Sequence, residues 1–330
     1  MDDTILRIQG LRVHYETETE VVEAVNGVSF GLKRGKMLGL VGETGAGKTT
    51  IAMSILRLVQ SPGRILEGSI QFNGQELLEL GEKQMRAIRN KGIAMIFQDP
   101  MTAMNPVLTV GEQVAEVIRT HEKGISRADA AKKAVDMFEL VGIPGARYNE
   151  YPHQFSGGMK QRVVIAEALA CNPELLIADE PTTALDVTIQ AQVLEMIHSL
   201  QKLRNTSMLL ITHDMGVIAE TCDDVAVLYA GNIVEYGTLE QVFENPCHPY
   251  TKGLFASLPS LDKDTGRLTP IEGLMPNPAN LPPYCSFCER CARAMGKCRE
   301  GEPAYIEVEP GHTVRCKLFE QGGSPDGRTA

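Results

Sequence analysis

A glycine-rich segment near the N-terminus ends in a lysine and a threonine. Its residues are Gly42, Glu43, Thr44, Gly45, Ala46, Gly47, Lys48 and Thr49, which fit the spacing G-x-x-x-x-G-K-[ST]. The glycines allow consecutive backbone N–H groups to curve around phosphate oxygens without a Cβ in the way. Lys48 supplies a positive charge for the terminal phosphates of a nucleotide, and the Thr49 hydroxyl is a ligand for Mg²⁺. The segment therefore predicts a phosphate-binding loop that extends to Thr50.

A second group of polar residues follows the apolar run Leu175–Ala178. Asp179 and Glu180 come directly after it, and ligands of open parallel sheets collect at the carboxyl ends of the strands. Asp179 there suits a partner of Mg²⁺, whereas Glu180 suits the residue that orients or deprotonates an attacking water. Two acidic residues after a strand are by themselves more often a solvated helix start. The functional interpretation depends on the phosphate-binding loop in the same chain.

Hydrophobic spacing indicates the elements that position these groups. Short strands are predicted before the loop, and a helix begins after it at Lys48. Val110–Val141 has helical periodicity, is interrupted near Gly124 and predicts a helical lobe. Strands and helical patterns alternate, which is typical of a parallel sheet covered by helices. The predicted strands are Ile5–Val13, Gly27–Leu32, Met37–Val41, Ile93–Phe97, Leu175–Ala178 and Met208–Ile211.

Composition narrows the function classes. The chain has 330 residues, of which 43% are hydrophobic and 22% charged, as expected for a globular protein with a large core. Its net charge of -10 disfavours a general nucleic-acid binder, because such affinity comes from Lys and Arg on phosphates. No apolar run approaches the roughly 20 residues of a membrane span. The acidic N-terminus lacks an export signal, so a cytosolic location is predicted.

The segment Phe155–Arg162, FSGGMKQR, resembles the signature sequence of ATP-binding-cassette ATPases, whose usual form is L-S-G-G-Q. Phe155 and Met159 replace its outer residues. Further family elements occur in the same order over roughly residues 4–255. They are Tyr15, at the position of the aromatic ring that stacks on adenine, Gln98 in FQDP, Asp186 in the loop Ala184–Asp186, and His213 in ITHD.

The resemblance implies ATP and Mg²⁺ as cofactors, with Thr49, Gln98 and Asp179 as ligands of the metal. It implies that Glu180, His213 and Gln98 act in hydrolysis. These roles agree with the chemistry of the residues, since Glu180 follows a strand end and a histidine after an apolar strand can hydrogen-bond a terminal phosphate.

The signature residues Ser156, Gly157 and Gly158 open a predicted helix, whose first N–H groups form an anion site. In the family this site and the loop of Asp186 complete the nucleotide pocket of a partner subunit. The resemblance therefore implies that one chain is catalytically incomplete.

The stretch Asn245–Thr251, the Pro-rich segment and the cysteine tail resemble the ATP-binding subunits of bacterial oligopeptide and dipeptide importers. This implies a second ATPase subunit, with a sister chain favoured over an identical one, two membrane permease subunits and an extracellular substrate-binding protein. It also implies a peripheral position at the cytoplasmic face of the plasma membrane. Nickel and glutathione importers have similar subunits and stay open. A cassette ATPase acting on DNA or ribosomes, and a nucleotide-binding regulator gated by the tail, are less favoured alternatives.

Five of the eight cysteines gather near the C-terminus, and in a reducing cytosol such a group favours a metal site. Their spacing, C-x2-C-x2-C-x6-C followed by a further cysteine, suits tetrahedral Zn²⁺ or a [4Fe–4S] cluster. The importer subunits carry C-x-F-x-x-R-C-x-x-A-x-x-x-C and then H-x-V-x-C, and this resemblance assigns the cluster to Cys285, Cys291, Cys298 and Cys316. Cys288 departs from that pattern, so a set with Cys288 in place of Cys316 stays open. Zinc, cysteines without any metal, and a disulfide also stay open, and a structural role of the metal is favoured.

These observations predict an α/β fold with a P-loop nucleotide-binding domain. The resemblance adds an N-terminal antiparallel β part, a central, mainly parallel sheet, a helical subdomain and a small C-terminal metal-cluster module. The predicted boundaries are 1–257 for the ATP-binding domain (helical subdomain about 99–170), 258–284 for a Pro-rich linker, 285–319 for the iron–sulfur module and 320–330 for a disordered tail.

Overall fold

The structure is a computed structural model that describes residues 3–99, 103–183, 185–257 and 270–320. The chain forms two compact units. The first unit comprises Met1–Ile5, Lys33–Lys36 and Glu79–Leu210, and the second comprises Leu6–Leu32, Met37–Leu78 and Ile211–Ala330. The domain boundaries inferred from the sequence stay predictions.

The second unit contains an antiparallel sheet with the strand order β2-β1-β4-β5. Its long strands alternate buried and exposed side chains, as expected where one face covers a core. Leu6 lies opposite Phe72, and the β1–β4 register shifts near Arg12. The strands are β1 (Thr4–Glu16), β2 (Val21–Lys33), β4 (Gly63–Phe72) and β5 (Gln75–Glu76).

A second set of strands in this unit has the order β11-β12-β10-β9-β3. β3 pairs in parallel with β9, and the other pairs are antiparallel. β3 is completely buried, in agreement with its uninterrupted apolar sequence. The strands are β3 (Met37–Val41), β9 (Asp224–Tyr229), β10 (Asn232–Thr238), β11 (Tyr305–Glu309) and β12 (His312–Arg315). The helices of the unit are α1 (Lys48–Ile55), α8 (Met215–Thr221), α9 (Leu239–Glu244) and α10 (Pro249–Ala256).

The first unit holds the parallel pair β6 (Ile93–Ile96) and β7 (Leu175–Asp179), and β8 (Ser207–Thr212), next to β7, begins in it. All three strands are buried along their length, which confirms the prediction of strands covered on both faces. The prediction extended the first of them to Phe97, whose side chain is 41% exposed and lies beyond the strand end.

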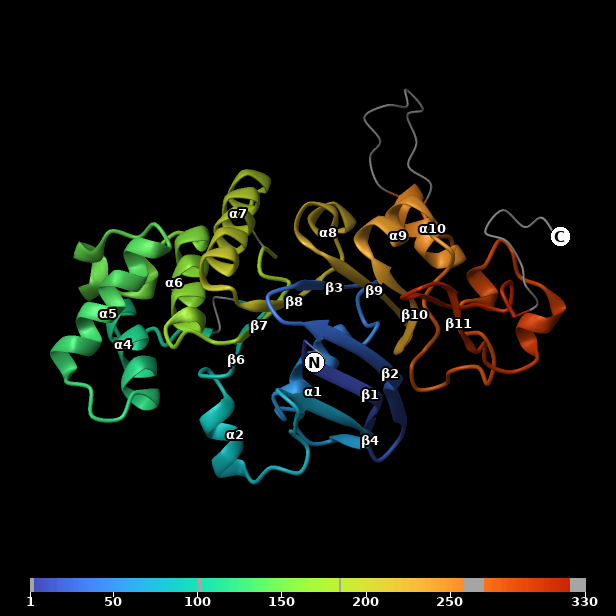
Figure 1. The fold of residues 1–330 in the computed structure, drawn as a ribbon, viewed down its shortest axis with the longest axis horizontal. Helices are drawn as coiled ribbons and strands as arrows, with labels where there is room; N and C mark the ends of the chain where they lie inside the picture. Colours follow the sequence, from blue (N-terminus) through green and yellow to red (C-terminus); the bar gives the residue numbers. More distant parts are fainter. Residues whose placement is uncertain (1–2, 100–102, 184, 258–269, 321–330) are drawn as a thin grey trace. The chain divides into compact units, whose positions relative to one another are not determined.

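The helices of the first unit include the predicted helical lobe. α4 (Val110–His121) and α5 (Arg127–Leu140) are separate helices, and Gly124 between them has a positive φ of 84°, which confirms the predicted interruption. Each begins at a hydroxyl residue, Thr109 or Ser126, that accepts a hydrogen bond from the third helical N–H. Figure 1 shows both helices beside α6 (Gly157–Leu169). The remaining helices are α2 (Glu82–Ile88) and α7 (Val187–Arg204), and the short 3-10 helices are Gly145–Asn149 and Pro152–Gln154.

The described C-terminal residues are built onto the second unit. β12 pairs with β10, with Val314 opposite Glu235, and Val314, Cys316 and Phe319 share a small apolar core with Cys247. The sequence predicted a separate module after the linker and missed this pairing. Residues 270–284 contain no helix or strand, and two 3-10 helices follow, Cys288–Arg290 and Gly296–Arg299. The earlier part of the predicted linker, 258–269, and residues 321–330 lie outside the described residues.

In the described part of the chain, no helix is both long enough and apolar enough to span a bilayer.

Candidate functional site

The phosphate-binding loop connects β3 to α1, the strand-to-helix context that its sequence requires. Lys48 lies at the first turn of α1, is 6% exposed, and donates hydrogen bonds from Nζ to the carbonyl oxygens of Gly42, at 2.6 Å, and Glu43, at 3.0 Å. These bonds curl the loop around the ammonium group. Gly45 and Gly47 have positive φ values of 84° and 103°, a conformation that side-chain-bearing residues rarely adopt.

Two glycines of the loop are required by close backbone approach. A Cβ on Gly42 would lie 2.1 Å from the carbonyl oxygen of Leu228, and one on Gly47 would lie 2.3 Å from that of Ala24. Both obstacles are backbone atoms of strands that cannot give way without breaking sheet pairing. The loop is therefore closely packed against the neighbouring strands β2 and β9, which favours a preformed phosphate cradle.

Tyr15 lies at the end of β1, half-buried, with its hydroxyl 3.4 Å from the hydroxyl of Thr50. The second unit thus brings the ring that we expect to stack on adenine next to the start of α1. Thr49, the expected Mg²⁺ ligand, is exposed at the same helix start.

The predicted carboxylates lie in the first unit at the end of β7. Asp179 is the last residue of the strand and is 1% exposed. Glu180 has a left-handed backbone with φ of 46°, which is costly for a residue with a side chain. Its carboxylate accepts hydrogen bonds from Gln98 Nε2, at 3.1 Å, and Thr183 Oγ1, at 2.9 Å. Two residues with predicted roles in hydrolysis, Gln98 and Glu180, are therefore in direct contact.

The signature residues open α6, a helix of 13 residues in the first unit. Ser156 is exposed and caps the helix, because its hydroxyl accepts a hydrogen bond from Met159 N–H at 3.4 Å. Gly157 and Gly158 supply the first helical N–H groups. A Cβ on Gly158 would lie 2.5 Å from Ile189 of α7, so this glycine also permits close helix packing. The structure confirms that this segment opens a helix, as the sequence predicts, and its role as an anion site stays a prediction.

Two further predicted residues stand next to helix starts. Asp186 is exposed and caps α7 by accepting a hydrogen bond from Ile189 N–H at 3.0 Å. His213 is exposed after the buried strand β8, and the next residue, Asp214, caps α8. Both residues therefore lie on loops that follow rigid elements.

The C-terminal cysteines are buried or half-buried thiols that influence one another. Burial raises the pKa of Cys316 to about 12, and the neighbouring thiols of Cys285, Cys291 and Cys298 add to the rise. Burial likewise raises the pKa of Cys285 to about 11. The backbone joins two members of the group, since Cys285 N–H donates to the Cys298 carbonyl at 3.3 Å. The four predicted ligands therefore lie in one neighbourhood.

These thiols do not form a tight group suited to one small ion. Thiolates on a tetrahedral zinc lie about 4 Å apart. Among the described residues, the group in which three potential ligand atoms lie within 4.8 Å of one another is Glu235, Cys247 and His312. The C-terminal cysteines that the structure describes form no group this close, and the zinc alternative stays open as a prediction.

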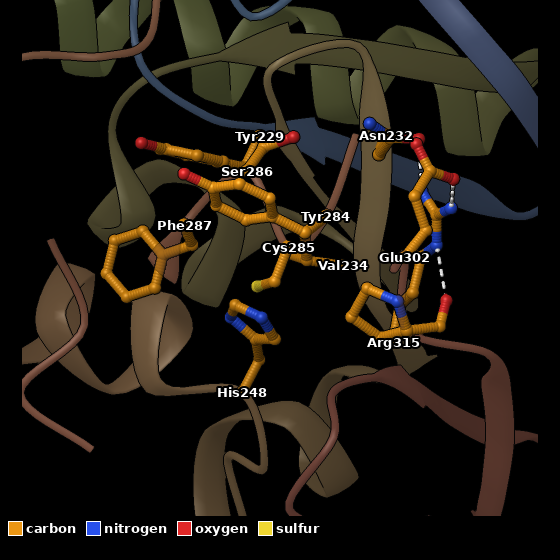
Figure 2. A pocket seen from close by; sticks show the side chains of 11 residues that line it. Tyr229, Asn232, Val234, His248, Tyr284, Cys285, Ser286, Phe287, Glu302 and Arg315 are labelled. Carbon is orange, nitrogen blue, oxygen red and sulfur yellow. Dashed lines mark hydrogen bonds and ion pairs between the residues drawn. The ribbon is translucent and has the colours of Figure 1, made fainter. Parts of the chain in front are cut away.

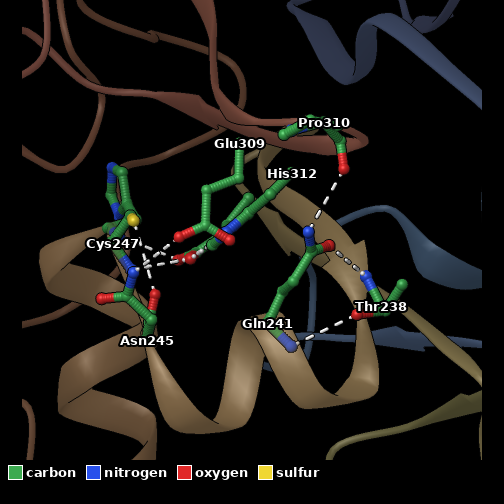
Figure 3. A network of polar contacts seen from close by, with 9 residues as sticks. Thr238, Gln241, Asn245, Cys247, Glu309, Pro310 and His312 are labelled. Carbon is green, nitrogen blue, oxygen red and sulfur yellow. Dashed lines mark hydrogen bonds and ion pairs between the residues drawn. The ribbon is translucent and has the colours of Figure 1, made fainter.

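Glu235, Cys247 and His312 belong to a buried hydrogen-bond network rather than an open metal site, and Figure 3 labels Cys247 and His312. The Glu235 carboxylate accepts hydrogen bonds from the backbone N–H groups of Cys247, at 2.7 Å, and His248, at 2.8 Å. His312 Nε2 lies 2.9 Å from the same carboxylate, and the side chains of Glu235 and His312 are both fully buried. The network joins β10, the start of α10 and β12, so it anchors the C-terminal strands.

Two residues outside the predicted site contact the phosphate-binding loop. Tyr250 accepts the backbone N–H of Glu43 at 3.0 Å, and Arg290 donates to the Glu43 carboxylate at 2.8 and 3.1 Å. Phe287 packs against Tyr229 and Tyr250, with ring centroids 5.1 and 5.4 Å away. Figure 2 shows Phe287, Cys285 and Tyr229 around a cavity of about 20 Å³, room for a single water. Sequence reasoning noted Tyr250 and Arg290 only as parts of longer motifs.

Comparison with known families matches two parts of the chain. Residues 25–183 match the family model described as ABC transporter, and residues 234–298 match the model described as oligopeptide/dipeptide transporter, C-terminal region. The second match covers most of β10, the network residues Glu235, Cys247 and His248, and the first four C-terminal cysteines.

Curated relatives resemble the chain over almost its full length. The oligopeptide transport ATP-binding protein AppD of Bacillus subtilis is 48% identical over 97% of this chain and 98% of its own. The probable peptide ABC transporter ATP-binding protein y4tR of Sinorhizobium fredii is 50% identical over 95% of each. The dipeptide transport ATP-binding protein DppD of Escherichia coli is 43% identical over 97% of this chain and 99% of its own.

A solved structure of the dimeric ABC transporter cassette MJ0796, bound to ADP and phosphate, has a TM-score of 0.64 and 26% identity, and covers 71% of this chain and 98% of its own. The likeness confirms the expected P-loop ATPase fold with mixed sheets and helices. The chain therefore belongs to the ABC transporter family of ATP-binding proteins, in the group that carries the oligopeptide/dipeptide transporter C-terminal region.

Proposed function

We propose that this chain is the ATP-hydrolysing subunit of a membrane transporter that imports dipeptides or oligopeptides. The observation that carries the proposal is the similarity to peptide-transport ATP-binding proteins over 97% of the chain, for relatives from both Bacillus subtilis and Escherichia coli. A likeness limited to residues 25–183 would support an ATPase of any cassette type. The additional match at residues 234–298 supports the peptide-transport group.

In this proposal ATP binds at the loop of residues 42–50. Tyr15 stacks on the adenine, a contact worth about 1–3 kcal/mol for a base on an aromatic ring. The loop N–H groups and Lys48 hold the phosphates, and His213 contacts the terminal one. Glu180 acts as general base on the attacking water, and its hydrogen bonds from Gln98 and Thr183 support this role by orienting the carboxylate.

Mg²⁺ fits the donor set that the sequence predicts, because a hydroxyl, an amide carbonyl and a carboxylate are the hard oxygen ligands this ion prefers. Thr49, Gln98 and Asp179 would hold it, and bound Mg²⁺ neutralises charge on the phosphates. Gln98 uses its Nε2 to donate to Glu180, so the amide oxygen is the atom it would present to the metal.

The proposal includes a partner ATPase. Ser156, Gly157 and Gly158 stand exposed or half-exposed at the start of α6, where N–H groups favour an anion. We assign them, with Asp186, to the nucleotide bound by a second ATPase subunit, favoured as a sister chain. Two membrane permease subunits, to which this chain binds peripherally at the cytoplasmic face, and an extracellular substrate-binding protein complete the assembly.

We also propose that Cys285, Cys291, Cys298 and Cys316 hold a [4Fe–4S] cluster with a structural role. Support comes from the matching cysteine pattern and from the common neighbourhood of the four thiols. Anaerobically purified protein should be brown, with broad absorbance near about 400 nm from thiolate–iron charge transfer. A colourless protein with one stoichiometric zinc would overturn this assignment.

The test of the transport function is reconstitution of the chain with a candidate sister ATPase and candidate permease subunits, chosen from adjacent genes, in liposomes supplied with a peptide-binding protein. Dipeptides or oligopeptides should stimulate ATP hydrolysis and accumulate in step with it, and Glu180→Gln should slow both. If nickel or glutathione stimulates ATP hydrolysis and peptides do not, the transported substrate is nickel or glutathione rather than a peptide. Hydrolysis that no permease stimulates would overturn the proposal of a transport ATPase.

A further inference from the structure

Arg290 lies in the short 3-10 helix Cys288–Arg290, and its guanidinium group is fully engaged. An arginine has five N–H donors, and five hydrogen bonds are made here. Two go to the Glu43 carboxylate, at 2.8 and 3.1 Å, and one to the Tyr229 hydroxyl, at 3.4 Å. The other two go to the backbone carbonyls of Glu272, at 3.0 Å, and Ile271, at 3.3 Å.

The pair with Glu43 differs from the surface ion pairs of this chain. The Arg290 side chain is 7% exposed and that of Glu43 is 30% exposed, whereas the Arg299–Glu289 pair in the same segment is 58% and 62% exposed. The Arg290 guanidinium group binds the Glu43 carboxylate in a bidentate manner, with one nitrogen donating to each oxygen. This geometry is stronger and more directional than a single hydrogen bond. Water screens such a pair less than it screens an exposed one.

Glu43 is the second residue of the phosphate-binding loop, and every polar group of it is held. Its N–H donates to the Tyr250 hydroxyl at 3.0 Å, its carbonyl accepts from Lys48 Nζ at 3.0 Å, and its carboxylate accepts from Arg290. A carboxylate in a loop that cradles phosphates is a like charge close to the ligand. Without a cation beside it, this carboxylate would oppose nucleotide binding in proportion to the phosphate charge.

We propose that Arg290 is a positioning residue for nucleotide binding, which neutralises Glu43 and holds its carboxylate away from the phosphates. The inference rests on the proposed ATPase function and adds a residue from the cysteine-rich segment to it. Because Arg290 stands between Cys288 and Cys291, the conformation of that segment determines where its guanidinium group lies. The phosphate-binding loop and the C-terminal segment thereby act as one structural element.

The test compares ATP, ADP and adenosine binding by calorimetry in the full-length chain. Arg290→Met should weaken ATP binding by about tenfold or more, as expected for a lost hydrogen-bonded charge pair, and ADP binding by less. Adenosine binding should stay unchanged. The loss for ATP should shrink as salt is raised, because added ions partly screen the carboxylate of Glu43, which has lost its cation. Adding Glu43→Gln to Arg290→Met should restore most of the ATP affinity.

Arg299→Met, which removes the exposed pair in the same segment, is the matched control and should bind ATP as the wild type does. Equal ATP affinity in Arg290→Met and wild type would overturn the inference, as would a loss that is equal for adenosine or that Glu43→Gln fails to restore. If Arg290→Met does not fold, Arg290→Lys serves instead, since it keeps the charge and loses the bidentate fork. Its ATP affinity should fall less than about tenfold and recover with Glu43→Gln, and unchanged affinity would again overturn the inference. Wild-type protein that binds no ATP would refute the proposed function itself.

Discussion

Replacing Glu235 by Gln should loosen the attachment of the C-terminal strands. The substitution keeps the shape of the side chain and removes its charge and one acceptor atom. In the structure one carboxylate oxygen accepts the Cys247 N–H, at 2.7 Å, and lies 2.9 Å from His312 Nε2, while the other accepts the His248 N–H, at 2.8 Å. A glutamine oxygen can replace only one of these two acceptors.

The loss of stability in Glu235→Gln follows from the buried N–H groups that lose an acceptor. If the amide oxygen keeps the contacts to Cys247 and His312, its NH₂ group faces the buried N–H of His248. An unsatisfied buried donor costs about 1–3 kcal/mol, and the two retained bonds lose their charge assistance, which roughly halves their strength. Relief of the buried charge offsets part of this loss. The expected net destabilisation of the local structure is about 3 kcal/mol.

Hydrogen exchange followed by mass spectrometry is the suitable assay, because it reports the opening of single segments. A local loss of about 3 kcal/mol corresponds to amide exchange that is roughly a hundredfold faster in β10 and β12. The control is Glu309→Gln, which changes an exposed carboxylate that accepts one bond from Asn245 at 3.3 Å. Equal protection of β12 in Glu235→Gln and Glu309→Gln would refute the anchoring role of Glu235.

Three shorter predictions address hydrolysis and stability. Glu180→Gln should bind ATP but hydrolyse it about 10²–10⁴-fold more slowly in the reconstituted transporter, and unchanged turnover would remove Glu180 from the mechanism. Burial raises the pKa of Glu167 to about 7, and its Oε1 has no hydrogen-bond partner among the described residues. Because the folded state binds this proton more tightly than the unfolded state does, the folded state loses stability as pH rises from 4.5 to 7. Glu167→Gln should therefore be more stable than wild type by about 3 kcal/mol at pH 8 and about equally stable near pH 4.5. Urea unfolding at the two pH values measures this difference. Gly158→Ala should lower the free energy of unfolding by about 1 kcal/mol or more, and with it the melting temperature, because the new Cβ would lie 2.5 Å from Ile189. Gly157→Ala is the control and should be tolerated, since its Cβ would lie 3.7 Å from the nearest atom.

The parts of the fold that depend on local sequence were predictable. Continuous apolar runs identified the buried strands β3, β6, β7 and β8 to within one or two residues at each end. The spacing of apolar residues also identified α4 and α5, and Gly124 identified the break between them. In each case the signal lies within a stretch about as long as the element, so a single sequence is sufficient to detect it.

Pairing between distant strands left no such signal. Glu235 and His312 are 77 residues apart in the chain, and nothing near either residue indicates that β10 pairs with β12. A histidine that follows a turn at the start of a short apolar–polar alternation is compatible with many environments. The sequence therefore suggested a cysteine module with its own boundaries, whereas the described residues of that segment share a core with Cys247 and extend the strands of the second unit.

The ion pair of Arg290 and Glu43 shows why the chemistry of the loop was only partly predictable. The motif defines what each loop residue does locally, namely backbone cradle, ammonium group and metal ligand, and assigns no task to the side chain of Glu43. That side chain needs a cation because it carries a charge near phosphates, and the cation comes from 247 residues further along the chain. A boundary at residue 257 would separate the two charges. If the C-terminal segment supplies this neutralisation, the phosphate-binding loop and the cysteine-rich segment must be preserved together for nucleotide to bind.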